Sequence, residues 1–96
     1  MYKLLLFLKK TDDEEVNEHF KNFTLKRLSD VIGREIKSGD VESSLLLDVK
    51  YSKFCEAAVE SKDEWDKMMN TKAGRELNND LMEFHSFVDL IFVDYK

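Results

Sequence analysis

The chain has no proline, one cysteine and three glycines among its 96 residues. A single cysteine, Cys55, excludes an internal disulfide and fits a reducing compartment. Without proline, the main breaks between elements are Gly33, Gly39 and Gly74. The length is that of one domain, so we expect a single domain over residues 1–96.

Several functional classes lack their usual sequence signals. No apolar run approaches the ~18 residues of a membrane span. The net charge is −5 with both signs interspersed, which excludes the basic stripe of a nucleic-acid-binding protein. No spacing of histidine, cysteine or carboxylates is typical of a metal site, and no glycine-rich loop would hold a phosphate. We therefore expect no metal or other cofactor, no nucleic acid and no membrane as partners. The stretch after residue 8 has no small-residue cleavage site of a signal peptide, so we expect a cytoplasmic protein.

The first apolar stretch, residues 2–8, is predicted to be a strand that is apolar on both faces. In a strand, Leu4, Leu6 and Leu8 point to one side, and Leu5 and Phe7 point to the other. A strand in a half-covered sheet would alternate apolar with polar residues, and this one does not. Both faces of its sheet therefore need a cover.

Two capping-box patterns, at residues 11–14 and 61–64, predict the starts of two helices. We expect the first helix to end at Gly33. Its predicted core-facing residues are Val16, Phe20, Phe23 and Val31, with Thr24 and Leu28 at the edge. Arg27 lies near this stripe, so its head should reach water or a carboxylate. The apolar pattern of the second helix weakens around residues 70–74, where we expect a kink or the start of a new helix.

Three further strands are predicted. Residues 33–41 form a short, mixed one, residues 51–60 alternate clearly, and residues 87–95 are apolar on both faces. Residues 45–50 are ambiguous between a strand extension and a packed loop. In the 51–60 strand, one face carries small or slender residues suited to close approach by a helix, namely Cys55, Ala57 and Val59.

The order strand, helix, strand, strand, helix, strand predicts an α+β fold, the ferredoxin-like βαββαβ arrangement with a four-stranded antiparallel sheet. Right-handed crossovers place both helices on one face of the sheet. Leaving the other apolar face in water would exceed what monomers usually tolerate. A second copy related by a two-fold axis would cover it, so we expect a homodimer that forms a dimeric α+β barrel.

The chain resembles the EthD-like family of dimeric α/β-barrel proteins over nearly its full length. The segments that carry the resemblance are residues 2–10, His19–Asn22, Gly33, Phe54–Ser61, Ala73–Leu77 and Asn79–Phe84. It departs from the family at Thr24–Arg27, where the family usually has a His-Ala-Pro-Leu-like segment, and at His85, where the family usually has an aspartate. The resemblance implies the fold, and it implies an accessory or uncharacterised protein of a degradative pathway.

Glu56 is the candidate catalytic residue. If its strand face lines the barrel, Glu56 is a carboxylate among apolar groups that would act as an acid or a base. The alternative is a structural pair with Arg27, Arg34 or a lysine. Thr24 would donate a hydrogen bond to a ligand, or else to its own backbone. The candidate ligand-binding residues are Tyr2, Thr24, Glu56, His85 and Tyr95.

Two functions remain open from the sequence. The first is the binding of a small hydrophobic metabolite in the barrel between two sheets, as an accessory protein or a cofactor-free enzyme, and it predicts a cavity of about 300 Å³ or more. The alternative is a non-enzymatic homodimeric binding or interaction module with a filled barrel and no active site. Neither reading names a substrate.

Overall fold

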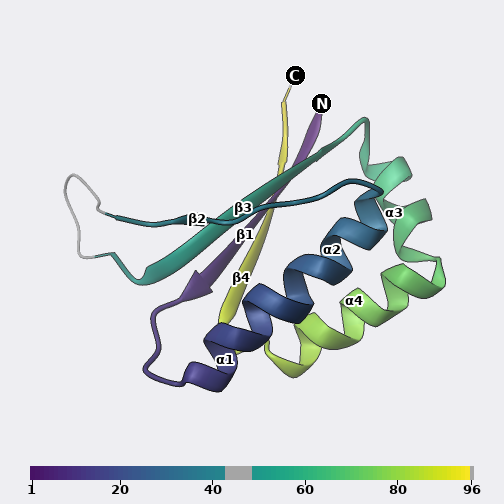
Figure 1. The fold of residues 1–96 in the computed structure, drawn as a ribbon. Helices are drawn as coiled ribbons and strands as arrows, with labels where there is room; N and C mark the ends of the chain where they lie inside the picture. Colours follow the sequence, from purple (N-terminus) through teal and green to yellow (C-terminus); the bar gives the residue numbers. More distant parts are fainter. Residues whose placement is uncertain (43–48, 96) are drawn as a thin grey trace.

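The computed structural model describes residues 1–42 and 49–95, which form one sheet with all of its helices on one side (Figure 1). Most of the ambiguous segment 45–50 lies outside the described residues. The elements are β1 (Tyr2–Lys9), α1 (Glu14–His19), η1 (Phe20–Thr24), α2 (Leu25–Ile32), β2 (Gly39–Asp40), β3 (Tyr51–Val59), α3 (Lys62–Met69), α4 (Lys72–Glu83) and β4 (Val88–Asp94).

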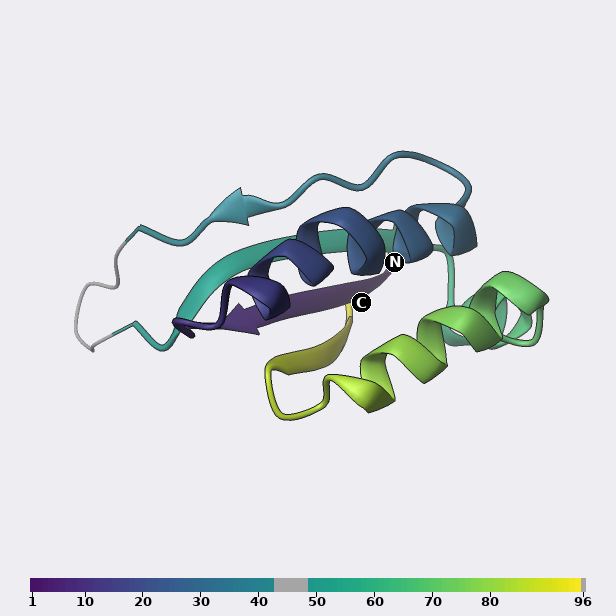
Figure 2. The same ribbon diagram turned by 60° about the horizontal axis from the view of Figure 1, so that its bottom comes forward.

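The four strands lie in the order β2-β3-β1-β4, and every neighbouring pair is antiparallel. The helical stretch that follows β1 and the helices that follow β3 lie side by side in one layer, with α2 packed against α4 (Figure 2). This topology is the ferredoxin-like α+β arrangement that the sequence predicts. No helix in the described part of the chain is long and apolar enough to cross a bilayer.

The central strand β1 has the two apolar faces that its sequence predicts. Leu4, Leu6 and Leu8 are 1–2% exposed and form the core with the helices. On β3, Cys55, Ala57 and Val59 are buried, as expected for the face that a helix approaches closely. The alternation of β1 and β3 therefore placed their core residues correctly.

The first helix begins two residues later than the capping box predicts. Asp13, not Thr11, is the N-cap, and its carboxylate accepts from the amide of Glu15 at 3.0 Å. Thr11 instead accepts from the amide of Asp13 at 3.1 Å. An aspartate two residues into the pattern can cap a helix as well as a threonine, and here it does.

The helix also contains a π-helical turn, η1, which changes its core-facing stripe. The amide of Leu25 bonds to the carbonyl of Phe20, five residues earlier. The additional residue in this turn rotates the following positions about the axis. The prediction that Phe23 faces the core was therefore wrong, because its side chain is 51% exposed. Thr24 and Leu28, expected at the edge, are buried, with 3% and 1% of their surface exposed.

The other helix ends agree with the sequence more closely. Gly33 closes α2 with a positive φ of 84°, the left-handed conformation that glycine adopts without strain. Ser61 caps α3 by accepting from the amide of Glu64 at 3.2 Å. The predicted break falls between Met69 and Lys72, where Thr71 caps a new helix. The predicted strand over residues 33–41 is reduced to β2, Gly39–Asp40.

Candidate functional site

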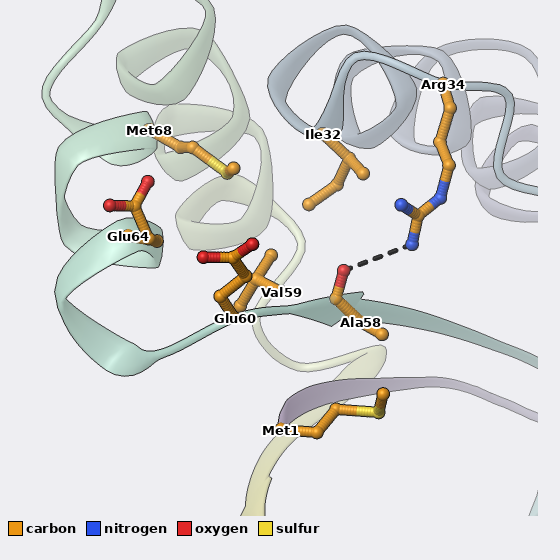
Figure 3. Close-up of a pocket in the computed structure, with 8 residues that line it drawn as sticks. All are labelled: Met1, Ile32, Arg34, Ala58, Val59, Glu60, Glu64 and Met68. Carbon is orange, nitrogen blue, oxygen red and sulfur yellow. Dashed lines mark hydrogen bonds between the residues drawn. The ribbon is translucent and has the colours of Figure 1, made fainter.

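A groove lies at one end of the sheet, where the start of α3 and the end of α2 meet the end of β3 (Figure 3). Its volume is about 680 Å³, within the range of small-molecule sites. We call it the end groove. It is lined by Met1, Ile32, Arg34, Ala58, Val59, Glu60, Glu64 and Met68.

The end groove combines apolar walls with charged heads. Arg34 donates from Nη2 to the carbonyl oxygen of Ala58 at 3.1 Å, which positions its guanidinium at the groove (Figure 3). Glu60 follows the last residue of β3, and Glu64 lies in the first turn of α3. No sequence pattern indicates this site, because its residues come from separate segments and meet only in the folded chain.

A second polar site is centred on Asp80 of α4, whose side chain is 3% exposed. We call it the Asp80 cluster. Oδ2 accepts from the hydroxyl of Thr24 at 2.6 Å, and Oδ1 accepts from Nη1 of Arg27 at 3.0 Å. Nε2 of His19 also contacts Oδ1. These three residues come from α1, η1 and α2, so the cluster joins the first helical stretch to α4.

Aromatic rings enclose the histidine of the Asp80 cluster. The ring of His19 stacks on Phe84 with 4.1 Å between centroids, and on Phe23 at 5.3 Å. A carboxylate on one imidazole nitrogen fixes the orientation of the ring, an arrangement that supports proton transfer at the other nitrogen. A polar hollow of about 210 Å³ lies beside the cluster and is lined by His19, Arg27, Glu76, Asn79, Asp80 and Glu83.

On its inner side the Asp80 cluster reaches a very small void. This void of about 10 Å³ is lined by His19, Thr24 and apolar residues of the core. Its size is near the lower limit for a single water molecule. The space between this part of the helical layer and the sheet is therefore packed, and the larger hollows lie at the surface.

The face of the sheet opposite the helices carries apolar and paired charged side chains. We call it the helix-free face. The register places Leu5 between Glu56 and Ile91, and Phe7 between Phe54 and Asp89. Lys3, Ala58 and Val93 lie on the same face.

An aromatic group occupies one end of the helix-free face. The ring of Phe7 lies 4.7 Å from Tyr51 and 4.9 Å from Phe54, centroid to centroid. Tyr51 donates to Asp89 at 2.6 Å, and this hydrogen bond raises the pKa of the tyrosine. Lys9 completes the group with an ion pair to Asp89 at 3.8 Å.

The sequence-predicted site residues are distributed over both faces. Glu56 lies on the helix-free face, is 52% exposed, and forms an ion pair with Lys3 at 3.8 Å. Lys3 in turn lies over the ring of Tyr95, 5.3 Å from its centroid. Glu56, Lys3 and Tyr95 therefore form one group. The surroundings of Glu56 were expected to be apolar, but they include the charge of Lys3.

The remaining predicted residues lie elsewhere. Tyr2 stacks on Phe92 with 5.5 Å between centroids, on the helix side of the sheet. Thr24 belongs to the Asp80 cluster. His85 is exposed after α4, and its Nδ1 lies 3.0 Å from the carbonyl oxygen of Met82. The five residues are thus not gathered in a single cavity of one chain.

Two residues of the Asp80 cluster could have been found from the sequence. Asp80 stands among Leu77, Leu81 and Phe84, at a spacing where a core residue is expected. A carboxylate at such a position needs buried donors, and Arg27 was expected to need an acceptor. The contribution of His19 had no comparable signal, because its contact is with a residue 61 positions away.

Cys55 is a packed thiol, as its position on the small-residue face indicates. It is 2% exposed, and burial raises the pKa of its thiol to about 12. A neutral, enclosed thiol is a poor nucleophile. Within residues 1–42 and 49–95, no group of three or more histidine, cysteine or carboxylate side chains is arranged to hold a metal ion.

Comparison with solved structures identifies the fold. An ethyl tert-butyl ether D (EthD) family protein from Bacillus halodurans C-125 matches with a TM-score of 0.81 and 21% sequence identity, covering 100% of this chain and 99% of that one. This chain has the fold of an EthD family protein. The At3g17210 protein of Arabidopsis thaliana matches less closely, with a TM-score of 0.62 and 20% sequence identity, covering 100% of this chain and 94% of that one.

No protein-family model and no curated protein matches the chain in sequence. The structural match to the EthD family protein confirms the fold that the sequence resemblance implies. Within this EthD fold, Thr24 stands where the resemblance implies a histidine. Its hydroxyl donates to Asp80, to which His19 also binds from one turn earlier.

Proposed function

We propose that the protein forms a homodimer through its helix-free face and binds a small hydrophobic metabolite between the paired sheets. Among the described residues, no helix covers the helix-free face. The observation that supports the proposal most directly is the position of five apolar residues on this face, namely Leu5, Phe7, Phe54, Ile91 and Val93. Of these residues, Ile91 has 46% of its surface exposed in a single chain. A second copy would remove this apolar area from water at about 25 cal/mol per Å².

The proposed ligand would contact both apolar and polar groups. Phe7 and Phe54 supply aromatic surface for a hydrophobic ring or chain. The Lys3–Glu56 pair supplies a carboxylate and an ammonium that a carbonyl or hydroxyl group of the ligand can bind. In this reading Glu56 acts as the acid or base if the protein is a cofactor-free enzyme, and as an orienting group if it is an accessory protein.

A second candidate function is favoured by a different observation. The Phe7, Tyr51 and Phe54 rings already pack together, and two ion pairs, Lys3–Glu56 and Lys9–Asp89, border them. Two such faces could interlock and leave no chamber. The protein would then be a homodimeric interaction module with a filled barrel.

The assembly is tested first, by light scattering on the chain at micromolar concentration. We expect twice the chain mass of 11.3 kDa. Ile91→Lys places a charge in the proposed interface and should give a monomer. Met82→Lys is the matched control, since Met82 is an exposed apolar residue on α4, and it should leave the dimer intact. A monomeric wild-type chain would contradict the proposal.

Ligand binding is tested by thermal shift with small aromatic and ketone metabolites. A binding compound should raise the melting temperature of the wild type and of Glu76→Gln, a control on α4, and should lose most of that shift in Glu56→Gln. A dimer that no compound stabilises would favour the filled-barrel module. Equal shifts in Glu56→Gln and the wild type would exclude Glu56 from the site.

A further inference from the structure

The end groove carries fixed charges of both signs that do not neutralise one another. Arg34 bonds to the carbonyl oxygen of Ala58 at 3.1 Å, and Glu64 bonds to Lys67 at 3.4 Å. No ion pair between Arg34 and either Glu60 or Glu64 is present among the described residues. The groove therefore keeps a guanidinium and a carboxylate that can each bind an opposite charge from outside.

The donor side of the groove is Arg34. Its guanidinium has five N–H groups in a rigid fork, and one is used in holding Ala58. The remaining donors suit a carboxylate, which an arginine binds through two parallel hydrogen bonds. The other nearby cation, the amino group of Met1, is already bonded to the carbonyl oxygen of Tyr95 at 3.2 Å.

The acceptor side is formed by Glu60 and Glu64, on the other side of Ile32 in the view of Figure 3. No ion pair of Glu60 is found in the described part of the chain. Its carboxylate, at the junction of β3 and α3, can accept from an ammonium group. Glu64 is half-buried and adds negative potential on the same side.

Between the two charged sides, the groove is apolar. Ile32 and Val59 lie between the guanidinium and the glutamates, and the thioethers of Met68 and Met1 flank them (Figure 3). Methionine side chains adapt to varied apolar shapes. A matching ligand thus has a carboxylate at one end, an ammonium at the other and an apolar body in between.

We propose that the end groove binds a small zwitterion with an apolar body, such as a hydrophobic dipeptide. Its carboxylate binds Arg34, its ammonium binds Glu60, and its side chains contact Ile32, Val59 and Met68. Every contact comes from one chain. The proposed contacts therefore do not require the dimer, although Ala58, whose carbonyl oxygen holds Arg34, also belongs to the helix-free face.

The experiment titrates the protein with three ligands that share the same apolar part. Binding is followed by the chemical shifts of the protein's backbone amides and by calorimetry. The ligands are the dipeptide Leu-Leu, its N-acetyl derivative, which has no ammonium, and its C-terminal amide, which has no carboxylate. The dipeptide should bind most tightly and shift amides around residues 32–34 and 58–64. Each modified ligand should bind about twofold to fivefold more weakly, the range of an exposed ion pair.

Two variants test which residue binds each charged group of the ligand. Glu60→Gln should weaken the dipeptide and the amide about twofold to fivefold but leave the N-acetyl derivative unchanged. Arg34→Gln should weaken the dipeptide and the N-acetyl derivative by a similar factor but leave the amide unchanged. Glu15→Gln, a change of equal charge in the first turn of α1, is the control and should bind all three ligands normally.

Three results would overturn the proposal: equal affinity for the three ligands, shifts that map away from the end groove, or variants that weaken all ligands alike. Ile91→Lys separates this proposal from the dimeric metabolite site. It should bind the dipeptide as well as the wild type does, even where it no longer dimerises. Loss of dipeptide binding in that variant would contradict a single-chain site.

Discussion

At the scale of single residues, Asp80 is the acceptor on which the polar contacts between the first helical stretch and α4 depend. It receives bonds from Thr24, Arg27 and His19 while its own side chain is almost fully buried. The sequence correctly indicates that the head of Arg27 would reach water or a carboxylate. It could not identify Asp80 as the partner, because the two residues lie 53 positions apart and on different helices.

Asp80→Asn should lower the free energy of unfolding by about 1–3 kcal/mol. The amide keeps the shape of the side chain but replaces one acceptor oxygen with a donor and removes the charge. Either the buried Thr24 hydroxyl or Arg27 then loses its acceptor. Urea unfolding followed by circular dichroism measures the change.

The control for Asp80 is Glu76→Gln, on an exposed position of the same helix. It removes an equal charge and should change stability by no more than about 0.5 kcal/mol. If Asp80→Asn were as stable as this control, the Asp80 cluster would contribute little to holding the helices together.

At the scale of elements, the first helical stretch shows what a periodic pattern can and cannot establish. The existence of the helix and its end at Gly33 follow from composition and glycine chemistry. The π-helical turn at Phe20–Thr24 has no residue that marks it. It rotates the stripe, so Phe23 turns outward and Thr24 turns inward to reach Asp80. Two of the misplaced residues, Phe23 and Thr24, lie in this turn, and the third, Leu28, follows it in α2.

The junction of α3 and α4 depends on the lack of a side chain at Gly74. A Cβ atom there would lie 2.4 Å from the Cα of Met69 and 2.5 Å from the carbonyl oxygen of Met68. Both are backbone atoms, so the two helices would have to separate. Gly74→Ala should therefore destabilise the fold by about 1–3 kcal/mol, although alanine is the better helix former.

Thermal unfolding tests this expectation. A loss of 1–3 kcal/mol corresponds to a decrease of several degrees in melting temperature for a domain of this size. Gly39→Ala is the control, because a Cβ atom there meets nothing within 4 Å. A Gly74→Ala variant as stable as Gly39→Ala would show that the junction is looser than the structure indicates.

At the scale of the whole molecule, the sequence predicted the topology but not the hollows. Apolar alternation on β1 and β3 and the two capping signals determine where the helices and sheet meet. The end groove has no such signal, because Arg34, Glu60 and Glu64 have neither a shared period nor a shared motif. They are brought together because α2 and β3 end, and α3 begins, at one edge of the fold.

The stability of the whole fold should fall in alkaline solution because of Cys55. Its pKa rises from an ordinary value near 8.5 to about 12 on folding. A raised folded-state pKa means that the stabilisation is fully present below the unfolded value and is lost as pH rises toward the folded one. The hydrogen bond from Tyr51 to Asp89 raises the pKa of Tyr51, so this residue also lowers the stability of the fold as the pH rises.

Urea unfolding of the wild type and of Cys55→Ala between pH 8 and pH 11 measures this effect. The wild type should lose stability more steeply than the variant above pH 9, whatever their difference at neutral pH. Parallel curves would indicate that the thiol ionises as readily in the folded chain as in the unfolded one.

Met1 has two roles in this structure. Its backbone exchanges hydrogen bonds with Tyr95, at 2.8 and 3.2 Å, and its side chain forms part of the end groove. A purification tag fused before it would remove a positive charge and bring foreign chain to the mouth of the groove. If the end groove binds the proposed zwitterion, a chain with extra residues before Met1 should therefore bind it with a different affinity from a chain whose first residue is Met1, even with an identical fold.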